Sequence, residues 1–142
     1  MFKYAAMTGQ FFETYAVSEI IKSYYNAGKR PQVFYYRDTD QKEIDLILEA
    51  NNTLCPFEIK KSASPDKNAV RHFGILSKTG KEIGVGGVIC MTDSVYPISN
   101  ENYYVPIWLI WMGACKRGCC SAYYNIKYSL AVEVISQAAS IQ

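Results

Sequence analysis

Three acidic residues and one lysine, Glu43, Asp45, Glu58 and Lys60, lie within one short stretch of the sequence. Two runs of alternating apolar residues flank Asn51-Asn52, a pair that tolerates the positive φ angles of a two-residue hairpin turn. If the two asparagines form the loop, Asp45 lies directly opposite Glu58, and Glu43 lies opposite Lys60. Because side chains alternate along a strand, all four are expected on one face of the hairpin. The sequence therefore predicts two adjacent carboxylates with a lysine beside them.

This arrangement suggests metal chemistry. Like charges directly opposite each other destabilise a hairpin, and a divalent cation between Asp45 and Glu58 would offset that repulsion. Mg²⁺, or Mn²⁺ in its place, prefers oxygen ligands and is often held by one or two carboxylates plus water. Such a metal lowers the pKa of a bound water and stabilises charge on an attacked phosphate. Lys60 would then orient that water or neutralise the developing charge.

Two other interpretations of these residues stay open. Glu43 stands opposite Lys60 in the predicted register, so it would compete for the ammonium group. Alternatively, only the apolar face of the hairpin meets the core. In that case Asp45 and Glu58 are ordinary surface residues, and the pair of Glu43 and Lys60 is a surface ion pair that contributes little stability.

The intervening residues of the hairpin are apolar and are predicted to face the core. Pro56, within the second strand, lacks the backbone N–H that a sheet ladder uses, so an edge position or a bulge is expected near it. The predicted apolar face consists of Ile44, Leu46, Leu48, Cys55, Phe57 and Ile59.

A helix is predicted over residues 8–27, with Thr8 as its N-cap and Gly28 at its end. A carboxylate on its apolar face is expensive unless it has a partner. Glu13 is either a third metal ligand, directly or through water, or a helix-start acid with a buried partner. At helical spacing Glu13 shares that face with Val17, Ile20 and Tyr24.

The other elements alternate between strands and helices. Val33–Arg37 is predicted as a strand, and a second helix begins with Ser64-Pro65 and ends near Gly80. Buried strands are expected at residues 83–91 and 103–110, with a polar loop between them. A helix between the third and fourth strands makes a crossover and implies parallel pairing. The predicted fold class is α/β, with a central mixed β-sheet flanked by helices.

Length and composition fit one compact domain with a real core, since 142 residues are 49% hydrophobic. The net charge of +2 does not by itself argue for nucleic acid. The longest apolar run, residues 105–115, is much shorter than the ~20 residues of a membrane span. No secretion signal is recognised, and an odd number of cysteines suits a reducing compartment. A cytoplasmic protein without a membrane partner or small-molecule cofactor is expected.

The last part of the chain, residues 111–142, is predicted to be an extension to a domain formed by residues 1–110. Its three cysteines lack a nearby fourth ligand, so they make a poor zinc site. A short apolar helix is expected over residues 130–141. The single histidine, His72, is expected to have a plain surface or core-edge role. The cysteines of this extension are Cys115, Cys119 and Cys120.

The order and spacing of four short motifs resemble a known family. Together they are similar to domain of unknown function 4143, the C-terminal domain of bacterial and archaeal AAA-type ATPases, from about residue 8 to about residue 110. The nuclease-like half of that domain is similar to the restriction-endonuclease-like, PD-(D/E)XK and Holliday-junction-resolvase fold. The motifs are Phe12-Glu13 through Val17 to Glu19-Ile20, Tyr36-Arg37-Asp38, Glu43-Ile44-Asp45-Leu46-Ile47, and Pro56-Phe57-Glu58-Ile59-Lys60-Lys61-Ser62.

The resemblance implies a catalytic site for metal-dependent hydrolysis of nucleic acid. Glu13, Asp45 and Glu58 match the acidic, metal-binding positions of the family, and Lys60 matches the lysine position. Ile44 stands where the nuclease signature has proline, which leaves the carboxylate of Asp45 in place. No phosphate-binding loop of the form G-x-x-x-x-G-K-[ST] occurs, so the ATPase domain would be absent from this chain.

Two classes of function follow. The first is a Mg²⁺- or Mn²⁺-dependent nuclease acting on DNA. The second is an inactive accessory module of an ATPase that binds nucleic acid or protein, because a fold can outlive its activity. In the first case, the cations expected to contact the phosphate backbone are Lys61, Lys67 and Arg71.

Overall fold

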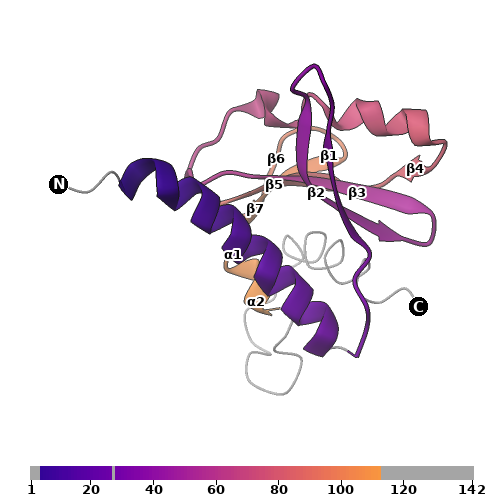
Figure 1. Cartoon of the computed structure of the whole chain (residues 1–142). Helices are drawn as coiled ribbons and strands as arrows, with labels where there is room; N and C mark the ends of the chain where they lie inside the picture. The colour runs from indigo at the N-terminus through magenta and orange to yellow at the C-terminus, as the bar shows by residue number, and fades with distance from the viewer. Residues whose placement is uncertain (1–3, 27, 113–142) are drawn as a thin grey trace.

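The computed structural model describes residues 4–26 and 28–112 of the chain (Figure 1). Its helices are α1 (Tyr4–Asn26), η1 (Lys67–Val70), η2 (Phe73–Thr79) and α2 (Leu109–Met112), of which η1 and η2 are 3₁₀ helices. Its strands are β1 (Val33–Arg37), β2 (Glu43–Ala50), β3 (Thr53–Ile59), β4 (Glu82–Ile83), β5 (Gly86–Cys90), β6 (Tyr96–Pro97) and β7 (Asn102–Pro106).

These strands form one mixed, seven-stranded sheet in the order β1-β2-β3-β5-β7-β6, with β4 beside β3. The pairs β1–β2 and β2–β3 are antiparallel, and the pairs β3–β5 and β5–β7 are parallel. In Figure 1, α1 and α2 lie on one side of the sheet, and η1 and η2 lie on the other. The predicted α/β class, with a mixed sheet and a parallel crossover, is confirmed.

Two apolar clusters fix the helices to the sheet. The larger one, the α1-side cluster, joins three residues of α1, spaced four apart, to alternate residues of β2 and β3. The smaller one, the η2-side cluster, joins Phe73 and Leu76 of η2 to Ile44, Ile47 and Leu54 of the hairpin. The principal members of the α1-side cluster are Ala16, Ile20, Tyr24, Leu46, Leu48, Phe57 and Ile59.

The β2–β3 hairpin has the predicted register next to its turn, but its ladder ends before the predicted pairs Asp45–Glu58 and Glu43–Lys60. Ala50 pairs with Thr53, and the pairing continues without a shift to Leu46 and Phe57. The turn residues Asn51-Asn52 have φ angles of 48° and 64°. These positive values are typical of the two-residue turn that matches the twist of a hairpin.

The pairing of β1 with β2 contains a β-bulge that the sequence did not predict. Phe34 pairs with Ile47 and Tyr36 pairs with Ile44, so two steps along β1 face three steps along β2. An extra residue on β2 reverses the alternation of its side chains beyond that point. Ile44 therefore packs in the η2-side cluster, and the prediction that it shares a face with Leu46 is wrong.

Pro56 lies in a central strand, so of the two predicted alternatives the edge position is wrong. A β-bulge does lie nearby, in the pairing of β1 with β2 next to Ile47, the partner of Pro56 on β2. On its parallel side, β3 pairs with β4 at Thr53 and Leu54 and with β5 from Phe57 onward. Pro56 falls in the gap between these two partners, where no ladder hydrogen bond needs its missing N–H. The strand can therefore be central and still contain a proline.

Helix α1 begins before the predicted N-cap, since Tyr4 to Thr8 are already helical and Thr8 lies inside it. Its predicted end is confirmed. Gly28 has a φ of 73°, and its amide donates a hydrogen bond to the carbonyl of Tyr25. A glycine is suited to this left-handed conformation because it has no Cβ.

The second predicted helix is instead two short 3₁₀ helices, η1 and η2. Its cap is Asp66 and not Ser64, because the carboxylate of Asp66 accepts a hydrogen bond from the amide of Asn68 at 2.9 Å. Gly80, with a φ of 73°, ends η2 as predicted. This segment still connects β3 to the parallel strands.

The two later strands are shorter than predicted. A break at Gly84-Val85 divides the strand expected at residues 83–91 into β4 and β5, and the strand expected at residues 103–110 ends at Pro106. The predictions for the three cysteines of the extension and for a helix at residues 130–141 lie outside the described residues.

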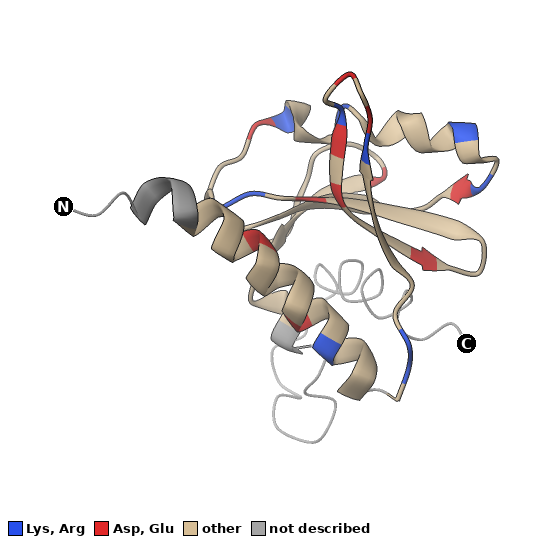
Figure 2. Ribbon diagram, viewed as in Figure 1, with Lys and Arg blue, Asp and Glu red and all other residues tan. Residues whose placement is uncertain are grey.

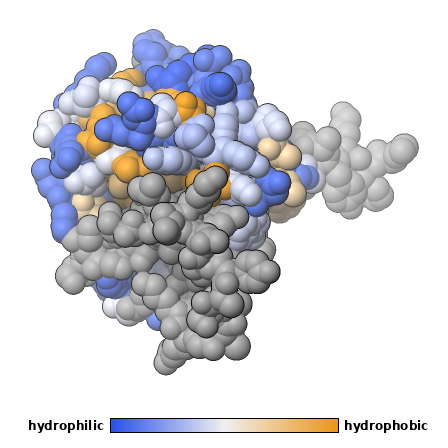
Figure 3. All heavy atoms as spheres, turned by 180° about the vertical axis from the view of Figure 1, so that it is seen from behind, coloured by the Kyte–Doolittle hydropathy of each residue, from blue (hydrophilic) through white to orange (hydrophobic). Residues whose placement is uncertain are grey.

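The described surface offers no broad apolar face in the view of Figure 3, where hydrophilic residues surround small apolar spots. Large exposed apolar side chains are distributed over α1, β1 and the region of β6. Within residues 4–26 and 28–112, no helix combines the length and apolar character that a membrane crossing requires.

Candidate functional site

Lys60 brings the two carboxylates of the hairpin together. Its ammonium nitrogen lies 3.1 Å from Oε2 of Glu58 and 3.6 Å from Oδ2 of Asp45. The side chain of Glu58 is 8% exposed and that of Asp45 is 16% exposed, whereas Lys60 is 45% exposed. The site is therefore a largely buried pair of acids, bridged by a cation that reaches solvent.

The local structure of β2 and β3 explains this position. The β2–β3 ladder ends at Leu46 and Phe57, and from there β3 continues beside β5. Asp45 bonds across the end of the ladder, because its Oδ2 accepts the backbone N–H of Ile59 at 2.9 Å. Lys60 is fixed at its own amide, which donates to the carbonyl of Ile89 at 2.9 Å.

The environment of Glu58 disfavours its charged form. Burial removes water from the carboxylate, and the neighbouring Asp45 adds like charge, so the pKa of Glu58 is raised to about 7. The ammonium of Lys60 opposes both effects but does not overcome them. Near neutral pH, Glu58 therefore exchanges a proton readily while it remains beside Asp45.

The environment of Lys60 favours its charged form, in contrast to that of Glu58. Burial alone would lower the pKa of its amine, but the charges of Asp45 and Glu58 outweigh burial and raise the pKa above the usual 10.5. Lys60 thus stays protonated at neutral pH. The site contains a permanent cation between two acids, one of which titrates near neutrality.

Glu43 does not compete for Lys60, which corrects the alternative that the sequence left open. Its Oε1 instead forms an ion pair with Arg37, 2.9 Å from Nε of that residue. The reason lies in the sheet, where Arg37 on β1 is paired directly with Glu43. The sequence motif that contains Arg37 did not indicate this role, because the β1–β2 register depends on the bulge.

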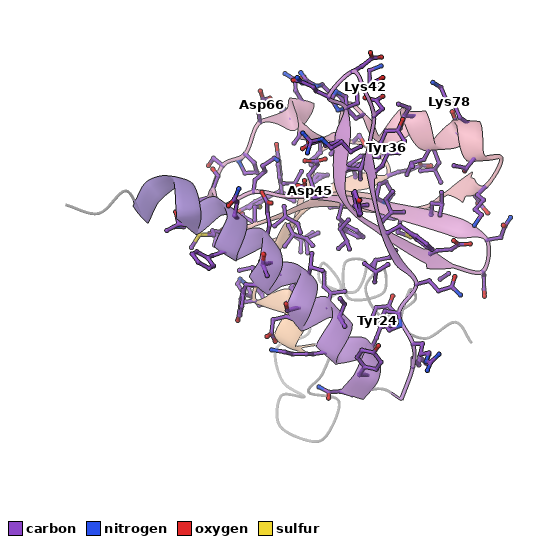
Figure 4. All side chains as sticks on the ribbon, in the orientation of Figure 1. Tyr24, Tyr36, Lys42, Asp45, Asp66 and Lys78 are labelled. Atoms are coloured by element: carbon purple, nitrogen blue, oxygen red, sulfur yellow. The ribbon has the colours of Figure 1, made fainter. Side chains whose placement is uncertain are left out.

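Glu13 approaches the site from α1. Burial and the charge of Asp45 both raise its pKa, and Lys60 lowers it in part. Glu13 and Asp45 line one groove, together with Val17, Tyr36 and other residues of α1 and β1. Figure 4 places Asp45 between α1 and the hairpin. Glu13 therefore faces the same site, and no hydrogen bond joins it to Asp45 among the described residues.

Two grooves lie beside the acidic pair. The α1-side groove, with a volume of about 420 Å³, contains Glu13 and Asp45. The η1-side groove, of about 540 Å³, contains Glu58 and Lys60. Glu43 lines both grooves. The acids and Lys60 are thus accessible from two sides of β2.

The donor atoms suit a hard divalent cation, because Asp45 and Glu58 supply carboxylate oxygens and Lys60 already occupies a cation position between them. In the described part of the chain, no three His, Cys, Asp or Glu side chains are grouped closely enough to hold a metal ion. Glu13, as the structure places it, does not complete such a group with Asp45 and Glu58.

Of the three cations predicted to contact nucleic acid, only Arg71 lines the η1-side groove; Lys61 and Lys67 lie outside its lining. Positive and negative residues lie close together around the turn that joins β1 to β2, and at η1 (Figure 2). His72 also lines this groove, which the sequence did not indicate. Its position in the sequence, next to Arg71 and in the segment that follows β3, could have suggested this placement.

Two tyrosines of β1 lie beside the α1-side groove. Tyr35 is 79% exposed and lines this groove with Tyr36. An exposed aromatic side chain beside the acids adds a surface on which a base could stack. The alternation of β1 did not predict this, because β1 is an edge strand with two adjacent exposed residues.

Comparison with known proteins gives one match. The family described as "Domain of unknown function (DUF4143)" matches residues 8–110. No curated protein and no solved structure matched the chain. The matched range includes α1 from Thr8 onward, the whole sheet and every residue of the site described above. This chain is a member of the DUF4143 family.

Proposed function

We propose that the domain is a nuclease-like phosphodiesterase with a restriction-endonuclease-like arrangement, which hydrolyses nucleic acid with the help of Mg²⁺ or Mn²⁺. The observation that carries this proposal is the bridge from Lys60 to both Asp45 and Glu58. Two adjacent acids and a lysine provide the groups needed to hold a divalent metal and to act on a phosphate.

The residues fit such a metal by their chemistry. Asp45 and Glu58 would hold it through carboxylate oxygens, and Glu13 would contribute from α1 through a bridging water. Because Mg²⁺ usually keeps several waters, two protein ligands are sufficient. When bound, the metal supplies a coordinated water of lowered pKa and positive charge beside the phosphate.

The side chains of the chain have distinct parts in this proposal. Lys60 would turn its ammonium from the carboxylates toward a phosphate oxygen, where it stabilises developing negative charge. Glu58 would release its proton from the carboxyl group, since a cation at this position favours the ionised form. Asp45 keeps its bond to the amide of Ile59 and so fixes the orientation of the acid pair.

A cleavage assay tests this function. Labelled single-stranded and branched DNA would be incubated with the protein and Mg²⁺ or Mn²⁺, with EDTA as the metal-free control. Cleavage is expected only with metal, and Glu58→Gln is expected to lower the rate by about 100-fold or more. Equal cleavage by wild type and Glu58→Gln would contradict the proposal, because the activity would then belong to a contaminant.

A second candidate is a non-catalytic module that binds nucleic acid or a protein partner for an ATPase. It is favoured by the lack of a three-ligand group among the described residues. In that case Lys60 permanently neutralises the site. A folded protein that binds DNA but neither binds metal nor cleaves would support this candidate and exclude the nuclease.

A further inference from the structure

Arg71 and His72 form a pair on the wall of the η1-side groove. Nε of Arg71 donates a hydrogen bond to Nε2 of His72 at 2.9 Å. A bond in this direction requires the imidazole tautomer that carries its proton on Nδ1. The bond occupies one edge of the guanidinium and orients its plane, and the opposite edge keeps its two amino groups for another ligand.

Arg71 has no carboxylate partner among the described residues, in contrast to Arg37, which is paired with Glu43. It is exposed, and it lines the same groove as Glu58 and Lys60. An arginine without an acid partner, with one edge already fixed by a neighbour, is preorganised for an anion that accepts through two oxygens. Two oxygens of a phosphate match the guanidinium fork in this way.

The acids that share this groove are already engaged. Glu43 is paired with Arg37, and Glu58 contacts Lys60. The carboxylate of Asp66 accepts hydrogen bonds from the amide of Asn68 at 2.9 Å and from its side chain at 3.4 Å. These contacts reduce the repulsion that an incoming phosphate would meet near Arg71.

We propose that the η1-side groove binds the phosphate next to the cleaved one, through the amino groups of Arg71, and that His72 is the positioning residue for that arginine. The identity of the ligand as nucleic acid rests on the proposed function. Arg71 and Lys60 line the same groove together with Glu58, so one strand lying in this groove would meet both cations.

The test measures DNA binding without metal. Fluorescence anisotropy of a labelled single strand, and of the matching duplex, would be recorded in EDTA over a range of salt concentrations. Arg71→Ala is expected to raise Kd about tenfold, because a charged hydrogen bond to phosphate is lost. The slope of log affinity against log salt is expected to fall by about 0.7 for the single strand and about 0.9 for the duplex.

Substitutions of His72 separate positioning from charge. His72→Leu removes the acceptor at unchanged charge and is expected to raise Kd about threefold, since the guanidinium regains rotamer freedom. His72→Gln retains an acceptor and is expected to restore near-wild-type affinity. Arg30→Ala is the matched control, because Arg30 is an exposed arginine outside both groove linings, and its Kd should change little.

Three results would overturn this inference: wild-type affinity in Arg71→Ala, no difference between His72→Leu and His72→Gln, or an equal loss in Arg30→Ala. A wild-type protein that does not bind DNA in EDTA would also overturn it. The outcome is distinguishable from failure of the nuclease, because binding through Arg71 without metal-dependent cleavage supports the phosphate subsite while excluding the proposed catalysis.

Discussion

Oδ2 of Asp45 accepts the backbone N–H of Ile59 at 2.9 Å, directly after the last paired residues of the β2–β3 ladder. A side chain thus replaces a backbone acceptor at the point where β3 leaves β2. The same carboxylate contacts the ammonium of Lys60. Asp45 therefore stabilises the end of the β2–β3 ladder and also belongs to the candidate site. A substitution of Asp45 affects both.

Asp45→Ala is expected to lower the free energy of unfolding by about 1–3 kcal/mol, because the amide of Ile59 loses its acceptor. Asp45→Asn keeps an acceptor oxygen and should cost clearly less. Urea denaturation of both variants would measure the difference. Equal stability of Asp45→Ala and wild type would show that the hydrogen bond to Ile59 contributes nothing.

Stability is expected to depend on pH through Glu58. Its pKa of about 7 in the folded protein exceeds the ordinary 4.5, so between these values the folded state binds more protons than the unfolded state. The free energy of unfolding contributed by Glu58 therefore falls as pH rises from about 4.5 to about 7, by on the order of 3 kcal/mol. Denaturant titrations at several pH values measure this slope.

Glu58→Gln removes the titrating group and should flatten that pH dependence. Glu82→Gln, at an exposed position on β4, is the matched control and should retain the wild-type slope. The remaining carboxyl with a raised pKa, Glu13, contributes with the same sign. A slope in Glu58→Gln as steep as in wild type would assign the effect to other groups.

Lys60 is expected to hold the pKa of Glu58 below the value that burial and Asp45 would impose. Lys60→Met removes this cation, so the pKa of Glu58 should rise above about 7. Carbon-13 NMR of the carboxyl groups would follow the titration directly. Lys61→Met, one residue along and exposed, should leave it unchanged; a lower pKa of Glu58 in Lys60→Met would contradict the described contact.

Gly87 allows β5 and β7 to approach each other. A Cβ on this residue would overlap the backbone carbonyl of Tyr103, its partner on β7. Gly87→Ala is expected to lower the free energy of unfolding by about 1–3 kcal/mol, visible as a lower Tm. Gly74→Ala meets no atom within 4 Å and serves as the control. An unchanged Tm in Gly87→Ala would mean that the strands separate without cost.

The hairpin at the centre of the site was predictable because its determinants are local. The Asn51-Asn52 turn and the alternating residues on each side fix the register as far as Leu46 and Phe57. The bulge in β2 was not predictable in this way, because it arises from pairing with β1. The bulge turns the side chain of Ile44 to the other face of the sheet. The pairing of β1 with β2 also places Arg37 beside Glu43.

Other differences also arise from partners that are distant in the sequence. Pro56 was expected at an edge because it lacks a donor, but the change of parallel neighbour from β4 to β5 makes that donor unnecessary. The 3₁₀ segment has several possible caps, Ser64 and Asp66 among them, and only the structure selects Asp66. The catalytic roles of Glu13, Asp45, Glu58 and Lys60 stay predictions.

The proposed nuclease requires Asp45 and Glu58 to hold a divalent cation. Isothermal titration calorimetry with Mn²⁺ would compare wild type with Glu58→Gln, and with Glu43→Gln as the control that removes a neighbouring carboxylate already paired with Arg37. We expect binding to wild type and Glu43→Gln, and loss of binding in Glu58→Gln. No binding to the folded wild type at millimolar Mn²⁺ would contradict the proposed metal site.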